Sequence, residues 1–177
     1  MNLEVFSTTL AWLLVGIFLP ALYHKLTQWQ RFVPALGAYR LLPDSLQRPM
    51  AGALVIGEFG AVAALVLMPQ LGFALAGALC GVYLLAMVIN LLRGRRMIDC
   101  GCGDTPTALS WALVLRNALL CGCAGLGWVL NAGLVLDLAA QALGLALALI
   151  GLVIYYAAEE LFANATRHRR LWLGEVA

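Results

Sequence analysis

Residues 50–92 read MAGALVIGEFGAVAALVLMPQLGFALAGALCGVYLLAMVINLL and contain a single charged side chain, Glu58. Pro69-Gln70 interrupts this apolar run near its middle. A helix needs about 20 predominantly apolar residues to cross the hydrocarbon core of a bilayer. The stretch therefore predicts two membrane spans, 50–68 and 71–92, joined by a tight turn.

Three further apolar runs extend this pattern over the whole chain, at residues 6–23, 109–130 and 134–157. The 177 residues are 63% hydrophobic and only 11% charged, with a mean hydropathy of +0.92. A soluble domain carries roughly 25% charged residues. The sequence predicts an all-α, polytopic membrane helix bundle with five transmembrane helices, forming a single membrane-embedded domain over residues 1–177. The alternative is four spans plus one interfacial helix.

The first apolar run differs from a secretory leader, which begins with a basic segment and ends at a small-residue cleavage site. No Lys or Arg precedes Phe6, and the run continues to Tyr23, so we expect a retained span. Residues 24–49 mix basic and aromatic side chains. That mixture suits a segment at the level of the lipid headgroups.

Positive charge lies on one side of the expected bundle. Ten of the eleven Lys and Arg residues fall in the segments after the first, third and fifth spans, and the eleventh, Arg116, lies inside the fourth span. Cytoplasmic loops carry an excess of Lys and Arg. The pattern predicts an inner (cytoplasmic) membrane protein whose N-terminus is outside and whose basic loops and C-terminus are cytoplasmic.

Two opposite charges lie inside the expected spans, Glu58 in the second and Arg116 in the fourth. Counting 1.5 Å per helical residue places both roughly 10–12 Å from the basic side. An ionisable group in a span needs a partner, so we expect a Glu58–Arg116 ion pair with Asn117 beside it. Such a pair identifies no function, because it can also serve only to hold helices together.

The polar loop between the third and fourth spans carries two thiols, Cys100 and Cys102, separated by Gly101 and flanked by Asp99 and Asp104. A disulfide across one residue closes a small, strained ring, and strained disulfides are the labile ones. The preceding arginines, Arg93, Arg95 and Arg96, favour the nucleophilic thiolate, whereas the two aspartates oppose it. The loop predicts a redox pair, with ordinary loop cysteines as the alternative.

A second Cys-Gly-Cys, Cys121 to Cys123, lies inside the fourth span. Structural zinc sites use spacers of two to four residues and four converging ligands. The spacer here is one residue, and the second pair lies about 18–21 Å below the loop, so no metal site is expected. Cys121 and Cys123 are candidates for an inner redox relay or for packing residues. Cys80 in the third span lies at a similar depth and could be a partner.

These residues carry a resemblance to a known family. Lys25, Tyr39-Arg40-Leu41-Leu42-Pro43, Glu58, Ile98-Asp99-Cys100-Gly101-Cys102-Gly103 and Val114-Leu115-Arg116-Asn117 together resemble the methylamine utilisation protein MauE family, within the wider DoxX-like membrane proteins. The resemblance covers most of residues 10–125. Asp104 departs from it, since the family's loop often continues Cys-Gly-Cys-Phe-Gly.

The resemblance implies a role in the maturation of methylamine dehydrogenase, whose small subunit is rich in disulfides. It implies a thioredoxin-like partner of the MauD type, the methylamine dehydrogenase small subunit as client, and membrane lipid as the surrounding medium. No nucleic-acid partner is expected. A quinone stays open as an electron acceptor, although the sequence marks no site for one.

Those client disulfides are periplasmic, whereas the charge pattern places Cys100 and Cys102 at the cytoplasm. If the charge pattern holds, electrons cross the bilayer through this protein. The function expected is thiol–disulfide exchange through Cys100-Gly101-Cys102. The contrasting functions are a non-enzymatic membrane scaffold and a small-molecule-binding protein centred on Glu58 and Arg116.

Overall fold

The computed structural model describes residues 3–95, 109–130 and 137–172. Every regular element in this part of the chain is a helix, and five of the helices are long and apolar enough to cross a membrane. The expected all-α bundle with five spans is confirmed. The elements are α1 (Leu3–Thr27), α2 (Trp29–Ala38), α3 (Asp44–Leu67), α4 (Pro69–Leu92), α5 (Trp111–Leu130) and α6 (Leu138–Trp172).

Most of the helices extend beyond the apolar runs that predicted them. The second span was expected from residue 50, but α3 begins at Asp44, directly after the extended backbone of Pro43. The fifth was expected to end at residue 157, but α6 continues to Trp172. Hydropathy marks only the part of a helix that lies in hydrocarbon, whereas the backbone hydrogen-bond ladder continues into the polar interface.

The beginning of α6 is set by a polar cap that the hydropathy pattern does not reveal. Both carboxylate oxygens of Asp137 accept backbone N–H groups of the first turn, from Ala139 at 3.2 Å and Ala140 at 3.3 Å. An acidic side chain at this position satisfies amide groups that have no partner within the helix. The helix therefore begins at Leu138, four residues after the expected start of the span.

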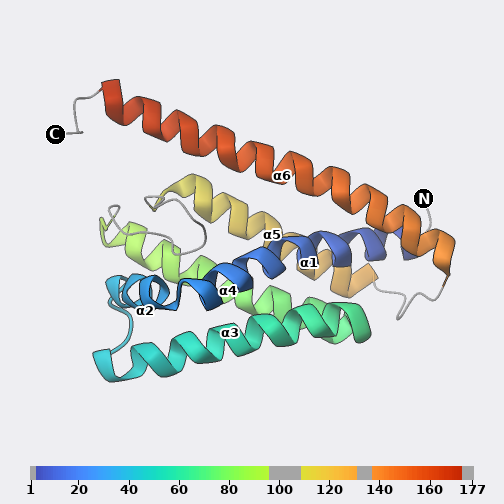
Figure 1. Ribbon diagram of the computed structural model, residues 1–177, viewed down its shortest axis with the longest axis horizontal. Coiled ribbons are helices and arrows are strands. Elements are labelled where there is room, and N and C mark those ends of the chain that lie inside the picture. The colour runs from blue at the N-terminus through green and yellow to red at the C-terminus, as the bar shows by residue number, and fades with distance from the viewer. Residues whose placement is uncertain (1–2, 96–108, 131–136, 173–177) are drawn as a thin grey trace.

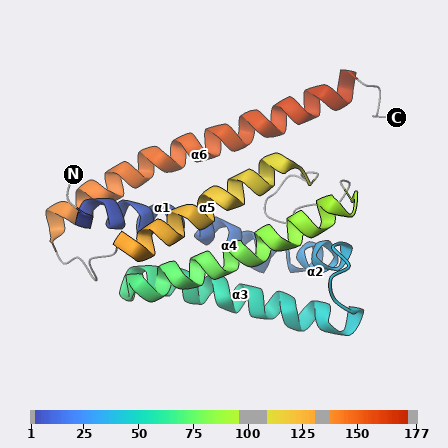
Figure 2. The same cartoon turned by 180° about the vertical axis from the view of Figure 1, so that it is seen from behind.

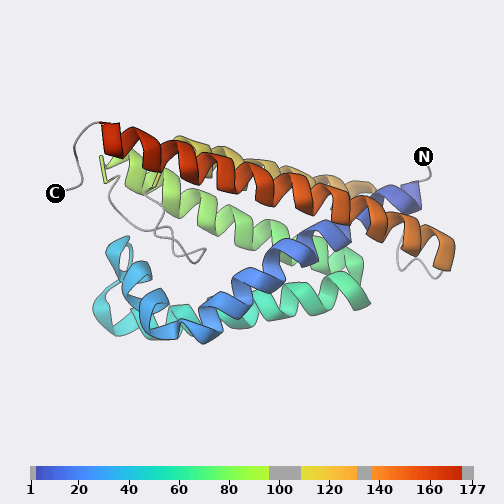
Figure 3. The same cartoon turned by 45° about the horizontal axis from the view of Figure 1, so that its top comes forward.

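The five long helices lie side by side, and the short α2 lies at one end of the bundle (Figure 1). Helices α3, α4 and α5 form an antiparallel series, which Figure 2 shows from behind. Helix α1 crosses the bundle obliquely, so that its first half lies against α6 and its second half approaches α3 and α2 (Figure 3). The ends of α1 and α4 and the beginnings of α3 and α5 all lie toward the α2 end of the bundle (Figure 1).

Small residues bring α1 and α6 together. Ala140 and Ala148 are buried, and a Cβ at Gly144 would meet the side chain of Thr8 at 2.7 Å, so these small residues, spaced four apart, form a packing face. Two long-range hydrogen bonds join the same helices: Trp12 Nε1 donates to Gln141 Oε1 at 3.0 Å, and the Tyr156 hydroxyl donates to the carbonyl of Gly16 at 2.9 Å. Close helix packing with hydrogen bonds is typical of association in lipid.

The outer surface of the bundle is strongly apolar. Large side chains such as Ile56 and Val153 are 73% and 69% exposed, although they lie on long helices. Exposed apolar area on this scale would drive a soluble protein to associate. It fits a multi-pass membrane protein, in which lipid covers these side chains.

We expect Gly72→Ala to destabilise the bundle strongly, because α3 and α4 touch through their backbones at this residue. A Cβ on Gly72 would lie 2.3 Å from the backbone nitrogen of Leu65, and backbone atoms cannot rotate away. Overpacking of this kind costs about 3 kcal/mol. Thermal unfolding in detergent measures the loss.

The matched control is Gly60→Ala on α3, where an added Cβ would meet nothing within 4 Å. We expect this variant to gain at most about 1 kcal/mol of unfolding free energy, because alanine has a higher helix propensity than glycine. Equal melting temperatures for the two variants would contradict the close approach of α3 and α4.

Candidate functional site

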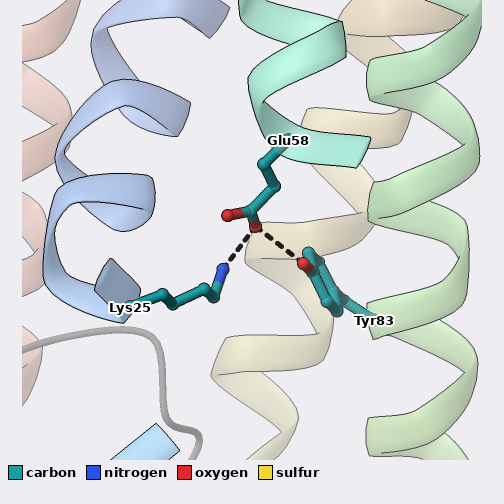
Figure 4. Close-up of polar contacts among 3 residues, drawn as sticks. All are labelled: Lys25, Glu58 and Tyr83. Atoms are coloured by element: carbon teal, nitrogen blue, oxygen red, sulfur yellow. Dashed lines mark hydrogen bonds and ion pairs between the residues drawn. The ribbon is translucent and has the colours of Figure 1, made fainter. Parts of the chain in front are cut away.

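The site centres on a buried ion pair between Lys25 of α1 and Glu58 of α3. The Lys25 side chain is 3% exposed and the Glu58 side chain 1%. Tyr83 of α4 donates its hydroxyl to the same carboxylate oxygen, Glu58 Oε1, at 2.6 Å (Figure 4). We call these three residues the Lys25–Glu58–Tyr83 triad, and it joins three of the five spanning helices.

Aromatic rings surround the ammonium group of the triad. Lys25 Nζ lies 5.5 Å from the ring centroid of Phe32 and 5.0 Å from that of Tyr83. A cation over an aromatic face is attracted by the ring quadrupole, and more strongly where water is excluded. Phe32 is buried and belongs to α2, so this short helix covers the triad at its end of the bundle. The expected interfacial segment thus contributes to the site.

One oxygen of the triad keeps unused bonding capacity. Glu58 Oε2 is buried and accepts no hydrogen bond from any residue that the structure describes. In Figure 4 both dashed contacts reach the other oxygen. An ionised carboxylate only accepts hydrogen bonds, so this atom is placed to take a proton or to accept a donor group.

The expected Glu58–Arg116 ion pair is wrong. Glu58 pairs with Lys25, and Arg116 Nη1 instead donates to Glu159 Oε1 of α6. Both actual partners, Lys25 for Glu58 and Glu159 for Arg116, were missed for the same reason, which is that the helices are longer than the apolar runs. Because α1 continues to Thr27, Lys25 lies on its last turn and not in a loop. Because α6 continues past residue 157, Glu159 lies on a helix beside Arg116.

The sequence contained signals for the missed members of the site. Lys25 follows an apolar run directly and belongs to the resemblance. Hydropathy alone, however, assigns it to the segment 24–49, where a lysine side chain reaches toward the lipid headgroups. Tyr83 lies mid-span, where a hydroxyl must find an acceptor. The rotation of each helix decides which groups meet, and hydropathy does not give that rotation.

Two asparagine side chains are also buried, Asn90 on α4 and Asn117 on α5. Each amide donates to a carbonyl one turn back in its own helix, Asn90 to Ala86 at 3.0 Å and Asn117 to Leu113 at 3.3 Å. Neither hydrogen bond reaches the triad. His24 precedes Lys25 and packs edge-on against the neighbouring Tyr23 ring, with centroids 6.0 Å apart.

The thiols fall into two groups. Cys100, Cys102 and Asp99 lie outside the described residues, between the ends of α4 and α5. Cys80, Cys121 and Cys123 are free thiols inside the bundle and belong to the central core or pack against it. Cys121 Sγ donates to the Gly77 carbonyl of α4 at 3.8 Å, so it faces α4. Among the described residues, no cluster of three or more His, Cys, Asp or Glu could hold a metal ion.

Comparison with known proteins matches the sequence of this chain to a family model. Residues 3–130, which include the triad, the Cys100–Cys102 loop and Arg116, match the family model described as methylamine utilisation protein MauE. No solved structure matches the chain.

Curated relatives agree with the family model. The chain is 37% identical to the methylamine utilization protein MauE of Paracoccus versutus over 88% of this chain and 86% of the relative. It is 34% identical to the MauE protein of Paracoccus denitrificans, over 80% of this chain and 79% of the relative. It is 35% identical to that of Methylorubrum extorquens, over 87% and 86%. The chain belongs to the MauE family of methylamine utilisation proteins.

Proposed function

We propose that this membrane protein serves methylamine utilisation by supporting the maturation of methylamine dehydrogenase through thiol–disulfide exchange at Cys100-Gly101-Cys102. The observation that carries the proposal is the family match over residues 3–130, which spans this loop together with the buried triad. The client would be the small subunit of the dehydrogenase, and the exchange partner a thioredoxin-like protein of the MauD type.

The proposed step conserves electrons. One thiolate of the Cys100–Cys102 pair attacks a partner disulfide and forms a mixed disulfide, and the partner's second sulfur leaves as a thiolate. The other thiol of the pair then attacks the mixed disulfide. The pair ends as a disulfide and the partner as a dithiol, so two electrons and two protons have passed to the partner. The reverse direction oxidises the partner by the same route.

The described helices support this role by fixing both anchors of the loop. Helix α4, which precedes the loop, is tied to α1 and α3 through Tyr83 and Glu58. Helix α5, which follows it, is tied to α6 through Arg116 and Glu159. The polar contacts of the bundle therefore hold the two helices that precede and follow the loop in the sequence.

We also propose that the α2 end of the bundle faces the cytoplasm in the inner membrane and that the N-terminus faces outward. The segments that carry the described Lys and Arg residues, apart from Arg116, gather at this end of the bundle (Figure 1). An excess of Lys and Arg marks cytoplasmic loops. Because the client disulfides are periplasmic, this orientation requires electrons to cross the bilayer through the protein, and the inner relay at Cys121 and Cys123 stays a prediction for that path.

The test measures the side and the oxidation state of the two loop thiols in cells that synthesise methylamine dehydrogenase. We expect a membrane-impermeant maleimide to label Cys100 and Cys102 only after the cells are permeabilised. Some of the protein will have its loop thiols in a disulfide, which the maleimide labels only after a reducing agent is added. We expect this oxidised fraction to change when the thioredoxin-like partner is deleted, because a redox-active pair equilibrates with its partner. Labelling in intact cells would reverse the orientation, and an unchanged oxidation state would contradict thiol exchange.

A second candidate function is a membrane scaffold or small-molecule-binding protein without redox chemistry. The buried, unused oxygen Glu58 Oε2 favours it, because a ligand with a donor group would satisfy that atom. The centre of such a site is the triad and not the Glu58–Arg116 pair. In that case neutralising Glu58 would abolish maturation, whereas removing Cys100 and Cys102 would leave it intact.

A further inference from the structure

We propose that Cys80 of α4 and Cys121 of α5 form a second, inter-helix dithiol that is oxidised to a disulfide by a lipid-soluble two-electron acceptor of the quinone class. The proposal goes beyond the exchange at Cys100 and Cys102 and does not depend on it. It rests on the packing of two helices that the structure describes fully.

The first observation is the register of α4 against α5. The two helices are antiparallel (Figure 1) and pack extensively along their length. A Cβ on Gly127 would meet the ring of Phe73 at 2.3 Å, and a Cβ on Gly77 would lie 3.5 Å from the Cβ of Ala124. Moving three residues forward on α4 and three back on α5 leads from Gly77 and Ala124 to Cys80 and Cys121.

The second observation is that Cys121 faces α4 one helical turn from Cys80. Cys121 Sγ donates to the Gly77 carbonyl at 3.8 Å, and Gly77 precedes Cys80 by three residues on α4. A disulfide requires a Cβ–Cβ separation of roughly 3.5–4.5 Å. A Cβ built on Gly77 would lie 3.5 Å from the Cβ of Ala124, which is at the lower end of this range, so one turn from the two cysteines the helices approach as closely as a disulfide needs.

The geometry also assigns the partner within the second Cys-Gly-Cys. Residues two apart on a helix point about 200° from one another, so Cys123 faces away from Cys121 on the same helix. Cys121 instead faces α4, where Cys80 lies one helical turn from the Gly77 carbonyl that Cys121 contacts. The competent pair is therefore Cys80–Cys121 and not Cys121–Cys123.

The position of the pair limits what can oxidise it. Cys80 is 2% exposed and lies twelve residues before the end of α4 at Leu92, or about 18 Å along the helix. A water-soluble disulfide does not reach this depth, whereas a quinone partitions into the bilayer. The balanced step is two thiols plus one quinone giving one disulfide plus one quinol, with both electrons and both protons passing to the quinone.

A carboxylate contacts α4 one helical turn beyond Cys80. Cys80 precedes Tyr83 by one helical turn on α4, and Tyr83 donates to Glu58. Glu58 Oε2 accepts no hydrogen bond from a described residue. Oxidation needs a thiolate, so a proton acceptor at this position serves the same reaction.

The test uses full-length protein in lipid vesicles, with Cys100→Ser and Cys102→Ser so that the loop thiols cannot take part. A fully substituted short-chain ubiquinone analogue is added, and peptide mass spectrometry identifies the linked cysteines. We expect a Cys80–Cys121 disulfide and roughly one quinol per chain, since one disulfide releases two electrons. Oxidised glutathione should give neither product.

Three single replacements in that background serve as controls. Cys80→Ser and Cys121→Ser should each abolish quinol formation, whereas Cys123→Ser should leave it unchanged. If a serine variant fails to fold, the mass of the linked peptide in the parent protein still identifies the pair. A Cys121–Cys123 link, a link between two chains, or the absence of quinol would overturn the proposal. None of these outcomes bears on the loop thiols, which are absent.

Discussion

Lys25→Met is expected to cost the bundle about 3–5 kcal/mol of unfolding free energy, because it leaves the Glu58 carboxylate buried without its counter-charge. Glu58 is 1% exposed, so water cannot replace the lost ammonium. Tyr83 still donates one hydrogen bond to Oε1, but a neutral hydroxyl does not balance a full charge. Denaturant unfolding in detergent micelles measures the loss.

The double variant Lys25→Met, Glu58→Leu is expected to recover most of this stability. Replacing both members of a buried ion pair with apolar residues of similar volume is often neutral, because the desolvation cost of both charges disappears. Arg31→Met serves as the control for loss of one positive charge, since Arg31 is exposed on α2. Equal losses for Lys25→Met and Arg31→Met would show that the triad contributes no more than a surface charge.

The second large effect is expected on activity. Replacing Cys100 and Cys102 together with serine should reduce methylamine dehydrogenase activity to the level of cells that lack this protein. A serine hydroxyl cannot attack a disulfide under these conditions, so no mixed disulfide forms and the client stays immature. Growth on methylamine and dehydrogenase activity in cell extracts give the readout, and free-thiol counts on the small subunit report its disulfides directly.

The control for this effect is Cys123→Ser, which removes a thiol from α5 without touching the loop. An immunoblot of the membrane fraction shows whether each variant accumulates normally. Full dehydrogenase activity from a stably inserted double-serine variant would rule out thiol exchange at the loop and favour the scaffold function. Partial activity with a reduced membrane level would instead report a folding defect, which the immunoblot separates.

Hydropathy predicted the fold well because the bilayer imposes a simple physical constraint. A span must satisfy its own backbone hydrogen bonds and present apolar side chains to lipid. Runs such as 71–92 therefore predict their helices closely, and the Pro69 turn coincides with the first residue of α4. The small-residue face of α6 was also predictable, since Ala140 and Ala148 recur at helical spacing and are buried.

The partners of the buried charges could not be predicted in the same way. Residue counting predicts a similar depth for Glu58 and Arg116, but depth does not tell which faces of two helices meet. Lys25 and Glu159 lie just beyond the apolar runs, in helical turns that hydropathy assigns to loops. The pairing of Cys80 with Cys121 likewise depends on the register of α4 against α5, which only the packed structure gives.

The contact between Arg116 and Glu159 has a consequence for the biogenesis of the protein. Chains are synthesised from the N-terminus and fold progressively. Glu159 belongs to α6, which is synthesised after α1 to α5, and this helix lies beyond the matched residues 3–130. Until α6 inserts, Arg116 lacks Glu159, and the first half of α1 lacks its packing surface.

The contacts of α1 and α5 with α6 therefore form after the rest of the described bundle has been made. The first five helices already contain the Lys25–Glu58–Tyr83 triad, so α1, α3 and α4 can associate early in synthesis. The helix that follows the thiol loop receives its ion-pair partner only after α6 has been made. The order of synthesis thus places the anchoring of the loop after the core of the bundle has formed.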